Sequence, residues 1–253
     1  MTGARAPKRW KRAPQSSRPG IFGGPGAVTS GAESPGARRR RARWGAGILH
    51  QLRREPDAMR EIGERMIRYG REKGLGMIVP FGKVFRGDAM AQHGEFAEGI
   101  AQMREGISEL RSIGTLFSLP SLLAGLAEAC ARCGNVDDGL TVVEEGLEMM
   151  RTGGEHFSLP EIYRVKGKLL LAGSVNDPNA AETAFCEVLS IARAQQAKSL
   201  ELRAAMSLAG LWCNQGKLQE ARELLAPVYG WFTEGFDTRD VKEAKAMLED
   251  LTA

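Results

Sequence analysis

The chain has 253 residues, of which 43% are hydrophobic, enough to bury the core of one large or two small domains. Its 35 basic and 31 acidic residues leave a net charge of only +4, but residues 1–47 carry +10 and the remainder −6. No run of apolar residues approaches the roughly 18 to 20 that cross a bilayer, which excludes a protein with membrane-spanning helices.

The amino-terminal 47 residues are basic and poor in large apolar side chains. They contain 11 basic residues and one acid, and five prolines and seven glycines fall before residue 44. Such a segment cannot offset its ordering entropy by burying surface, so we predict a disordered tail over 1–47 and a folded domain over 48–253. Clustered cations in residues 5–43 suit nucleic-acid phosphates. A solvated tail is favoured, because no nucleic-acid-binding fold accompanies the cations.

Targeting signals are not evident in this head. The apolar stretch after Arg43 is too short for the core of a signal peptide, and prolines interrupt any amphipathic transit helix. The spacing of the four cysteines does not demand disulfides, which indicates a reducing compartment. A cytoplasmic protein is therefore expected.

The remainder of the chain repeats with a period of about forty residues. The sequence Phe-Ser-Leu-Pro occurs at 117–120 and again at 157–160. Glycines at 94, 134 and 216 keep the same interval, allowing for a two-residue insertion near 175–177. A fixed period of this size is typical of repeat architectures, in which each unit stacks on its neighbours.

Each unit has the apolar spacing of two helices, with residues recurring at intervals of three and four. Proline suits the first turn of the leading helix, the glycine ends that helix, and small residues such as Gly99 and Gly139 let the second helix pack closely. We therefore predict an all-α solenoid of antiparallel helix hairpins. The expected repeats are about 77–113, 117–153, 157–196 and 199–232, followed by a capping helix over 238–251. Aromatic residues at 229, 231, 232 and 236 are expected to cover the terminal core, and a ligand pocket is the competing interpretation of this cluster.

These positions resemble the tetratricopeptide repeat, whose pattern places small residues, a glycine and aromatic or large apolar residues at fixed positions. The best-matching unit has Gly87, Gly94, Phe96, Gly99 and Met103. The units here are longer than the family's usual 34 residues, so the resemblance implies tetratricopeptide-like repeats with extended helices.

The carboxyl-terminal part resembles a more specific group. The stretches 199–209 and 226–238 are similar to the tail of bacterial adenylate/guanylate cyclase-like ATPases, in which a class III cyclase domain and an ATPase module precede tetratricopeptide-type helices. The resemblance covers about residues 48–253, and it implies a signalling or regulatory module without the catalytic modules.

Motifs for chemistry are missing. The nearest approach to a phosphate-binding loop, Gly76 to Lys83, has five residues between its glycines instead of four, and Val84 supplies no hydroxyl. Cys130 and Cys133 lack the further ligands of a zinc site and are expected to be buried packing residues. We therefore expect no enzyme activity, no cofactor and no metal.

The tetratricopeptide resemblance implies that the inner helices line a concave groove for a protein or peptide. The corresponding positions are Asp88, Gln92, Glu128, Arg132, Arg164, Lys168, Arg203 and Asn214. Their mixed charges lack the Lys/Asn set of chaperone-binding members, so a cochaperone role is disfavoured. Ordinary solvated helix surface is the competing interpretation of these residues.

Three hypotheses for function remain open. The leading one is a non-enzymatic scaffold that binds a protein or peptide, or regulates a cyclase or ATPase supplied by another chain. The second is a nucleic-acid-associated protein that binds through the basic residues of 5–43. The third is a truncated cyclase or ATPase gene product with no independent role. The oligomeric state is left open.

Overall fold

The described part of the chain consists of α-helices and short connections. The computed structural model describes residues 45–116, 118–152, 156–172 and 176–252, and no strand occurs among them. A helix spans residues 45–53, so the last three residues of the predicted tail are helical. The rest of that tail, including its basic clusters, lies outside the described residues.

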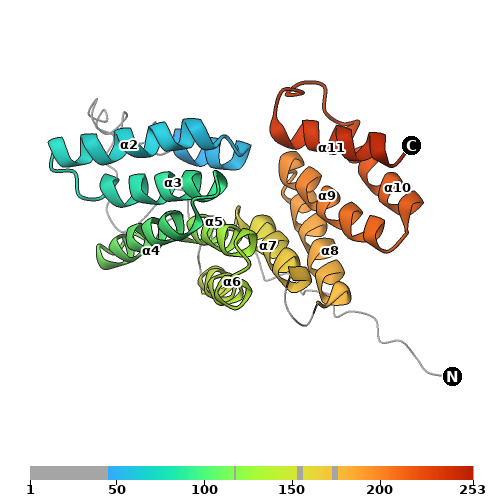
Figure 1. The fold of residues 1–253 in the computed structure, drawn as a ribbon, viewed down its shortest axis with the longest axis horizontal. Helices are drawn as coiled ribbons and strands as arrows, with labels where there is room; N and C mark the ends of the chain where they lie inside the picture. Colours follow the sequence, from blue (N-terminus) through green and yellow to red (C-terminus); the bar gives the residue numbers. More distant parts are fainter. Residues whose placement is uncertain (1–44, 117, 153–155, 173–175, 253) are drawn as a thin grey trace, which may run out of the picture. The chain divides into compact units, whose positions relative to one another are not determined.

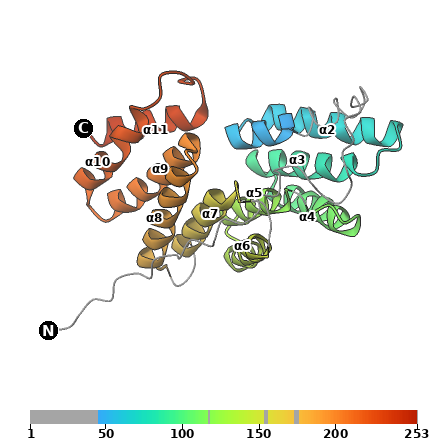
Figure 2. The ribbon, with the colours of Figure 1, turned by 180° about the vertical axis from the view of Figure 1, so that it is seen from behind.

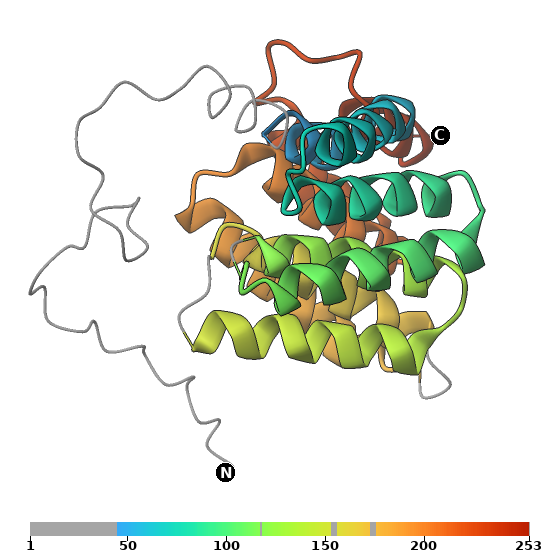
Figure 3. The same cartoon turned by 90° about the vertical axis from the view of Figure 1, so that its left-hand side faces the viewer.

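The helices follow one another as hairpins (Figure 1). They are α2 (Pro56–Glu72), α3 (Ile78–Gln92), α4 (Phe96–Ser112), α5 (Leu119–Arg132), α6 (Val136–Arg151), α7 (Leu159–Ala172), α8 (Pro178–Ala194), α9 (Lys198–Asn214), α10 (Leu218–Tyr229) and α11 (Arg239–Asp250). Helix α3 packs on α4, α5 on α6, α7 on α8 and α9 on α10, and each hairpin also packs on its neighbours. Figure 3 shows α2, α3 and α4 as successive layers. The predicted all-α solenoid of antiparallel hairpins is confirmed.

The turns inside three hairpins depend on glycine, as the sequence predicts. Gly94, Gly134 and Gly216 have φ of +94°, +81° and +77°, a left-handed conformation that costs glycine little. In each turn the next residue donates its backbone N–H to a carbonyl five residues earlier, as in Glu95 N to Met90 O at 3.0 Å. This bond closes the inner helix and reverses the chain.

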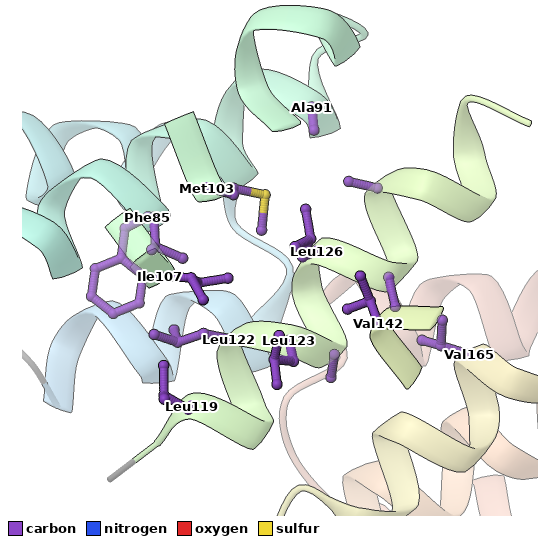
Figure 4. Packing of buried hydrophobic residues seen from close by; sticks show 14 of the residues in the cluster. Phe85, Ala91, Met103, Ile107, Leu119, Leu122, Leu123, Leu126, Val142 and Val165 are labelled. Carbon is purple, nitrogen blue, oxygen red and sulfur yellow. The ribbon is translucent and has the colours of Figure 1, made fainter. Parts of the chain in front are cut away.

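Two separate apolar clusters form the core of the described residues. The first runs from Ile48 to Leu169 and includes Phe85, Met103 and Leu122, which Figure 4 shows packed between α3, α4 and α5. The second is built from α8 to α11, with residues of α7 packed against it. Helix α7 therefore contributes to both clusters and joins them. None of the helices described in the structure is long and apolar enough to cross a membrane.

Close helix packing at glycine is clearest where α3 crosses α4. A Cβ added at Gly87 would lie 2.5 Å from the carbonyl oxygen of Gly99, and one at Gly99 would lie 2.5 Å from the carbonyl oxygen of Gly87. The predicted role of Gly99 is thus confirmed. A Cβ added at Gly139 would lie 3.3 Å from Cys130 Cβ of α5, the preceding helix of its own hairpin, and 2.7 Å from Leu169 of α7, so this glycine allows close packing on both helices.

Candidate partner-binding site

The inner helices of the array converge on one cavity of about 90 Å³. Residues from the segment 45–54, from α3, α5, α7 and α9, and from the first residue of α11 line it. The leading helix of each hairpin contributes to the wall, since these helices recur at equivalent positions along the stack. The cavity therefore lies where the sequence predicts the concave groove.

Six of the eight predicted groove residues line this cavity, namely Asp88, Gln92, Glu128, Arg132, Arg164 and Arg203. Lys168 lines a neighbouring cleft of about 360 Å³ and donates to Glu128 Oε1 at 2.9 Å. Asn214, the last residue of α9, lies in another cleft of about 510 Å³, which Lys168 also lines, and it is not among the residues that line the first cavity. The role of all eight residues in binding stays a prediction.

A buried ion network occupies one wall of the cavity. Arg164, whose side chain is only 8% exposed, donates to Glu128 at 2.6 Å and to Glu161 at 2.6 Å. Burial alone would raise the pKa of both carboxyls, but the charges of Arg164 and Arg203 and the hydrogen bond from Arg164 together outweigh it and lower the pKa of Glu161 to about 2. The pKa of Glu128 is lowered further, because Lys168 also contacts it. Both glutamates are therefore ionised at neutral pH.

Asp88 has a different environment in the same cavity. Its carboxylate accepts hydrogen bonds from Gln51 Nε2 at 2.9 Å and from Gln92 Nε2 at 3.1 Å. Burial raises the pKa of Asp88 above its ordinary value despite these two bonds. A Cβ at Gly125 would come within 2.7 Å of Gln51 Nε2, so glycine there leaves room for the amide.

The first and last parts of the described array are in contact at the cavity. Arg54 Nη1 lies 3.1 Å from Asp240 Oδ1 and 2.6 Å from Glu243 Oε2 of α11. Arg203 of α9 donates through Nε to Asp240 Oδ2 at 2.7 Å and through Nη2 to the carbonyl of Leu52. Figure 2 shows this end of the blue segment facing α11. We call the contact between residues 52–54 and α9/α11 the seam.

Sequence analysis missed several residues of this site. Gln51, Arg54, Glu161 and Asp240 are not groove positions of the repeat pattern. Gln51, Glu161 and Asp240 each bond to a residue that is, and Arg54 bonds to Asp240. One signal was available for Glu161: it lies three residues before Arg164 on the same helix, a spacing at which side chains meet. Asp240 and Arg54 offered no such local signal.

The carboxyl-terminal aromatic residues are only partly used in the core. Tyr229 and Phe232 pack against the second apolar cluster, as predicted. Trp231 is 57% exposed and Phe236 is 50% exposed, so the expectation that all four aromatics cover the terminal core is wrong for these two. Trp231 instead meets Phe232 edge to face, with Lys198 Nζ 5.6 Å from the centre of the indole ring.

The cysteines differ in exposure, which corrects one expectation. Cys130 is buried as predicted, but Cys133 and Cys186 are exposed and Cys213 is intermediate. The described residues contain no group of three His, Cys, Asp or Glu side chains placed to hold a metal ion.

We expect a thiol reagent to distinguish these cysteines in the native protein. Burial raises the pKa of the Cys130 thiol to about 11, whereas Cys133 is open to solvent. Brief treatment with iodoacetamide at pH 8, followed by peptide mass spectrometry, should therefore modify Cys133 well before Cys130. Denatured protein, in which all thiols react, is the control. Equal labelling of Cys130 and Cys133 in the native state would contradict the burial of Cys130.

Comparisons with known proteins support the fold. A crystal structure of a variant of a kinesin light chain-like protein of Podosopora anserina, built of nearly identical TPR-like repeats, matches with a TM-score of 0.50 at 20% identity, covering 78% of this chain and 96% of that one. A second structure of the same kind has a TM-score of 0.48 at 18% identity, covering 84% and 96%. No family model and no curated protein sequence matches the chain. The fold is thus tetratricopeptide-like.

Proposed function

We propose that this protein is a non-enzymatic scaffold whose inner helices bind an extended segment of a protein partner. The carrying observation is the convergence of five leading helical segments and the first residue of α11 on one cavity. A stack of helical hairpins presents such a continuous inner surface because each repeat contributes one helix to it. The tetratricopeptide-like fold is typically used for interaction rather than chemistry.

Arg132 is the best single probe of this surface. It is exposed at the cavity and donates to the carbonyls of Ala91 and Gln92, each at 3.2 Å, and it stacks 5.4 Å from the centre of the Phe96 ring. Arginines that combine planar donors with an accessible face are common anchors of protein interfaces. No carboxylate lies in a salt bridge with Arg132 among the described residues.

Selection from a random peptide library tests the proposal. We expect peptides selected on the full-length protein to bind with affinity at least tenfold weaker after Arg132→Ala, as the loss of an interface anchor predicts. The matched control is Arg65→Ala on α2, which removes an exposed arginine that pairs with Glu61 on its own helix. Thermal unfolding of both variants separates lost binding from lost folding. Selected peptides whose affinity is unchanged by substitutions at the cavity would overturn the proposal.

The resemblance of the carboxyl-terminal stretches supports a narrower proposal, a cytoplasmic regulatory module for a cyclase-like ATPase carried on another chain. Those stretches form α9 and the connection from α10 to α11, beside the seam. Adding the purified protein to a cyclase-like ATPase that lacks its own helical tail should change the rate of cyclic nucleotide formation. An unchanged rate at saturating protein would contradict this narrower role and leave the scaffold proposal intact.

The alternative of a nucleic-acid-associated protein depends on residues 5–43, which lie outside the described residues. It stays a prediction, and loss of DNA or RNA binding after deletion of residues 1–43 is the result that would support it.

A further inference from the structure

The cavity is too small for the partner that the scaffold proposal requires. Its volume is about 90 Å³, below the roughly 150 Å³ of a protein cavity that admits a benzene ring. A large side chain of a peptide therefore fits inside the cavity only if the surrounding helices move apart. One of the contacts between these helices must then break.

The seam is a polar contact between two halves that have separate cores. Residues 45–53 belong to the first apolar cluster through Ile48 and Leu52, whereas α9 and α11 belong to the second. Clefts of about 250 Å³ and 360 Å³ border the contact, each lined by residues from both sides of it. No apolar cluster among the described residues spans the seam, so the two halves are joined by a core only through α7.

The bonds across the seam converge on a few groups. Arg54 pairs with Asp240 and Glu243, and Arg203 binds the Leu52 carbonyl. The side chains of Arg54 and Glu243 are 29% and 42% exposed, so salt screens their attraction, and the pair contributes far less than a packed interface. Asp240 keeps its partner Arg203 whether or not Arg54 is present, because both lie in the second half.

The backbone at Arg54 gives a second, independent observation. Arg54 ends the helix 45–53 with φ of +57°, the left-handed conformation that glycine supplies in the equivalent turns at 74, 94, 114, 134 and 216. A residue with a Cβ costs more in this conformation than glycine does. The chain thus places a strained arginine where glycine would suit the backbone better, and the side chain of that arginine makes the ion pairs of the seam.

We propose that Arg54 is a latch: its ion pairs with Asp240 and Glu243 hold the seam closed over the concave surface. The partner gains access when these ion pairs break and the two halves move apart, with α7 as the hinge. The inference rests on the scaffold proposal for its consequence, but the latch itself is testable without a partner. Raised ionic strength weakens the latch, and an approaching acidic group of the partner competes with Asp240 and Glu243 for Arg54.

Arg54→Gly is the informative variant because glycine suits the local backbone and removes the ion pairs of the seam. Its matched control is Gln196→Gly, since Gln196 occupies the equivalent turn before α9 with φ of +56° and lines no cavity described here. Hydrogen exchange measured by mass spectrometry on the full chain should show residues 45–53 exchanging about tenfold faster in Arg54→Gly. The α3–α6 hairpins should be unchanged, and Gln196→Gly should match the wild type throughout.

Salt supplies a test within the same experiment. Raising sodium chloride from about 50 mM to 500 mM should accelerate exchange of residues 45–53 in the wild type and have little further effect on Arg54→Gly. A peptide selected on the cavity should associate about tenfold faster with Arg54→Gly. Exchange at 45–53 that is equal in the wild type and the variant, or that rises equally in α3–α6, would overturn the latch. Unchanged association with a cavity-binding peptide would also overturn it, and the scaffold proposal would stand.

Discussion

Replacing Arg164 with alanine is expected to lower the free energy of unfolding by about 3–5 kcal/mol, the usual cost of removing one partner from a buried ion pair. Arg164 is 7% exposed and contacts Glu128 and Glu161, both at 2.6 Å. Without its guanidinium, the cations left beside these carboxylates among the described residues are Arg203, 3.6 Å from Glu161, and Lys168, which contacts Glu128. Urea unfolding at pH 7 measures the effect.

The matched control lies two residues along the same helix. Lys166 pairs with Glu144 at 2.6 Å, but the two side chains are 28% and 61% exposed, and such pairs contribute about 0–1 kcal/mol. Lys166→Ala should therefore change the unfolding free energy by no more than that. If Lys166→Ala and Arg164→Ala lowered the free energy of unfolding equally, the buried network would stabilise the protein no more than an exposed ion pair does.

The cost of Arg164→Ala should also depend on pH. The pKa of Glu161 is lowered from 4.5 to about 2, so its contribution to stability is complete above about pH 4.5 and is lost as the pH falls toward 2. The pKa of Glu128 is also lowered, so its contribution to stability is likewise lost as the pH falls. The difference in stability between wild type and Arg164→Ala should therefore shrink over this acidic range. A difference that grows toward pH 3 would contradict the charge assignment.

The hairpin architecture could be predicted because residues close together in the sequence determine it. Glycine at 94, 134 and 216 and apolar residues at helical spacing act within a few residues of one another, and their recurrence every forty residues reinforces each signal. The turn geometry at these glycines confirms this. The mistaken burial of Cys133 has the same origin, because apolar spacing alone does not tell the last exposed turn of a helix from the buried ones.

The candidate site was predictable only where it follows the repeat. Asp88 and Glu128 occupy equivalent positions forty residues apart, so a periodic pattern finds both. Arg54 and Asp240 are 186 residues apart and meet because of how the whole stack curves, which no local pattern encodes. Asn214 matches a groove position of the repeat pattern but does not line the cavity, because it lies at the far end of its helix from it.

Gly87→Ala is expected to destabilise the protein by about 3 kcal/mol, the upper part of the range for overpacking. In an ordinary exposed helix the same change would stabilise by about 1 kcal/mol, since alanine is the better helix former. Here the new Cβ would lie 2.5 Å from the carbonyl oxygen of Gly99 and 3.0 Å from the backbone nitrogen of Met103. Backbone atoms cannot rotate away, so α3 and α4 must separate, and the clash outweighs the helix propensity.

Three further variants, two single and one double, test this expectation. Gly76→Ala meets nothing within 4 Å and needs no left-handed backbone, so it should be neutral or stabilise by about 0.4–1 kcal/mol. Gly99→Ala meets the carbonyl of Gly87 at the same 2.5 Å and should cost as much as Gly87→Ala. Once one substitution has forced the helices apart, the second meets a wider gap, so the double variant should cost clearly less than the sum. Thermal unfolding of the four variants and the wild type measures these costs, and strict additivity would mean that the two glycines do not share one contact.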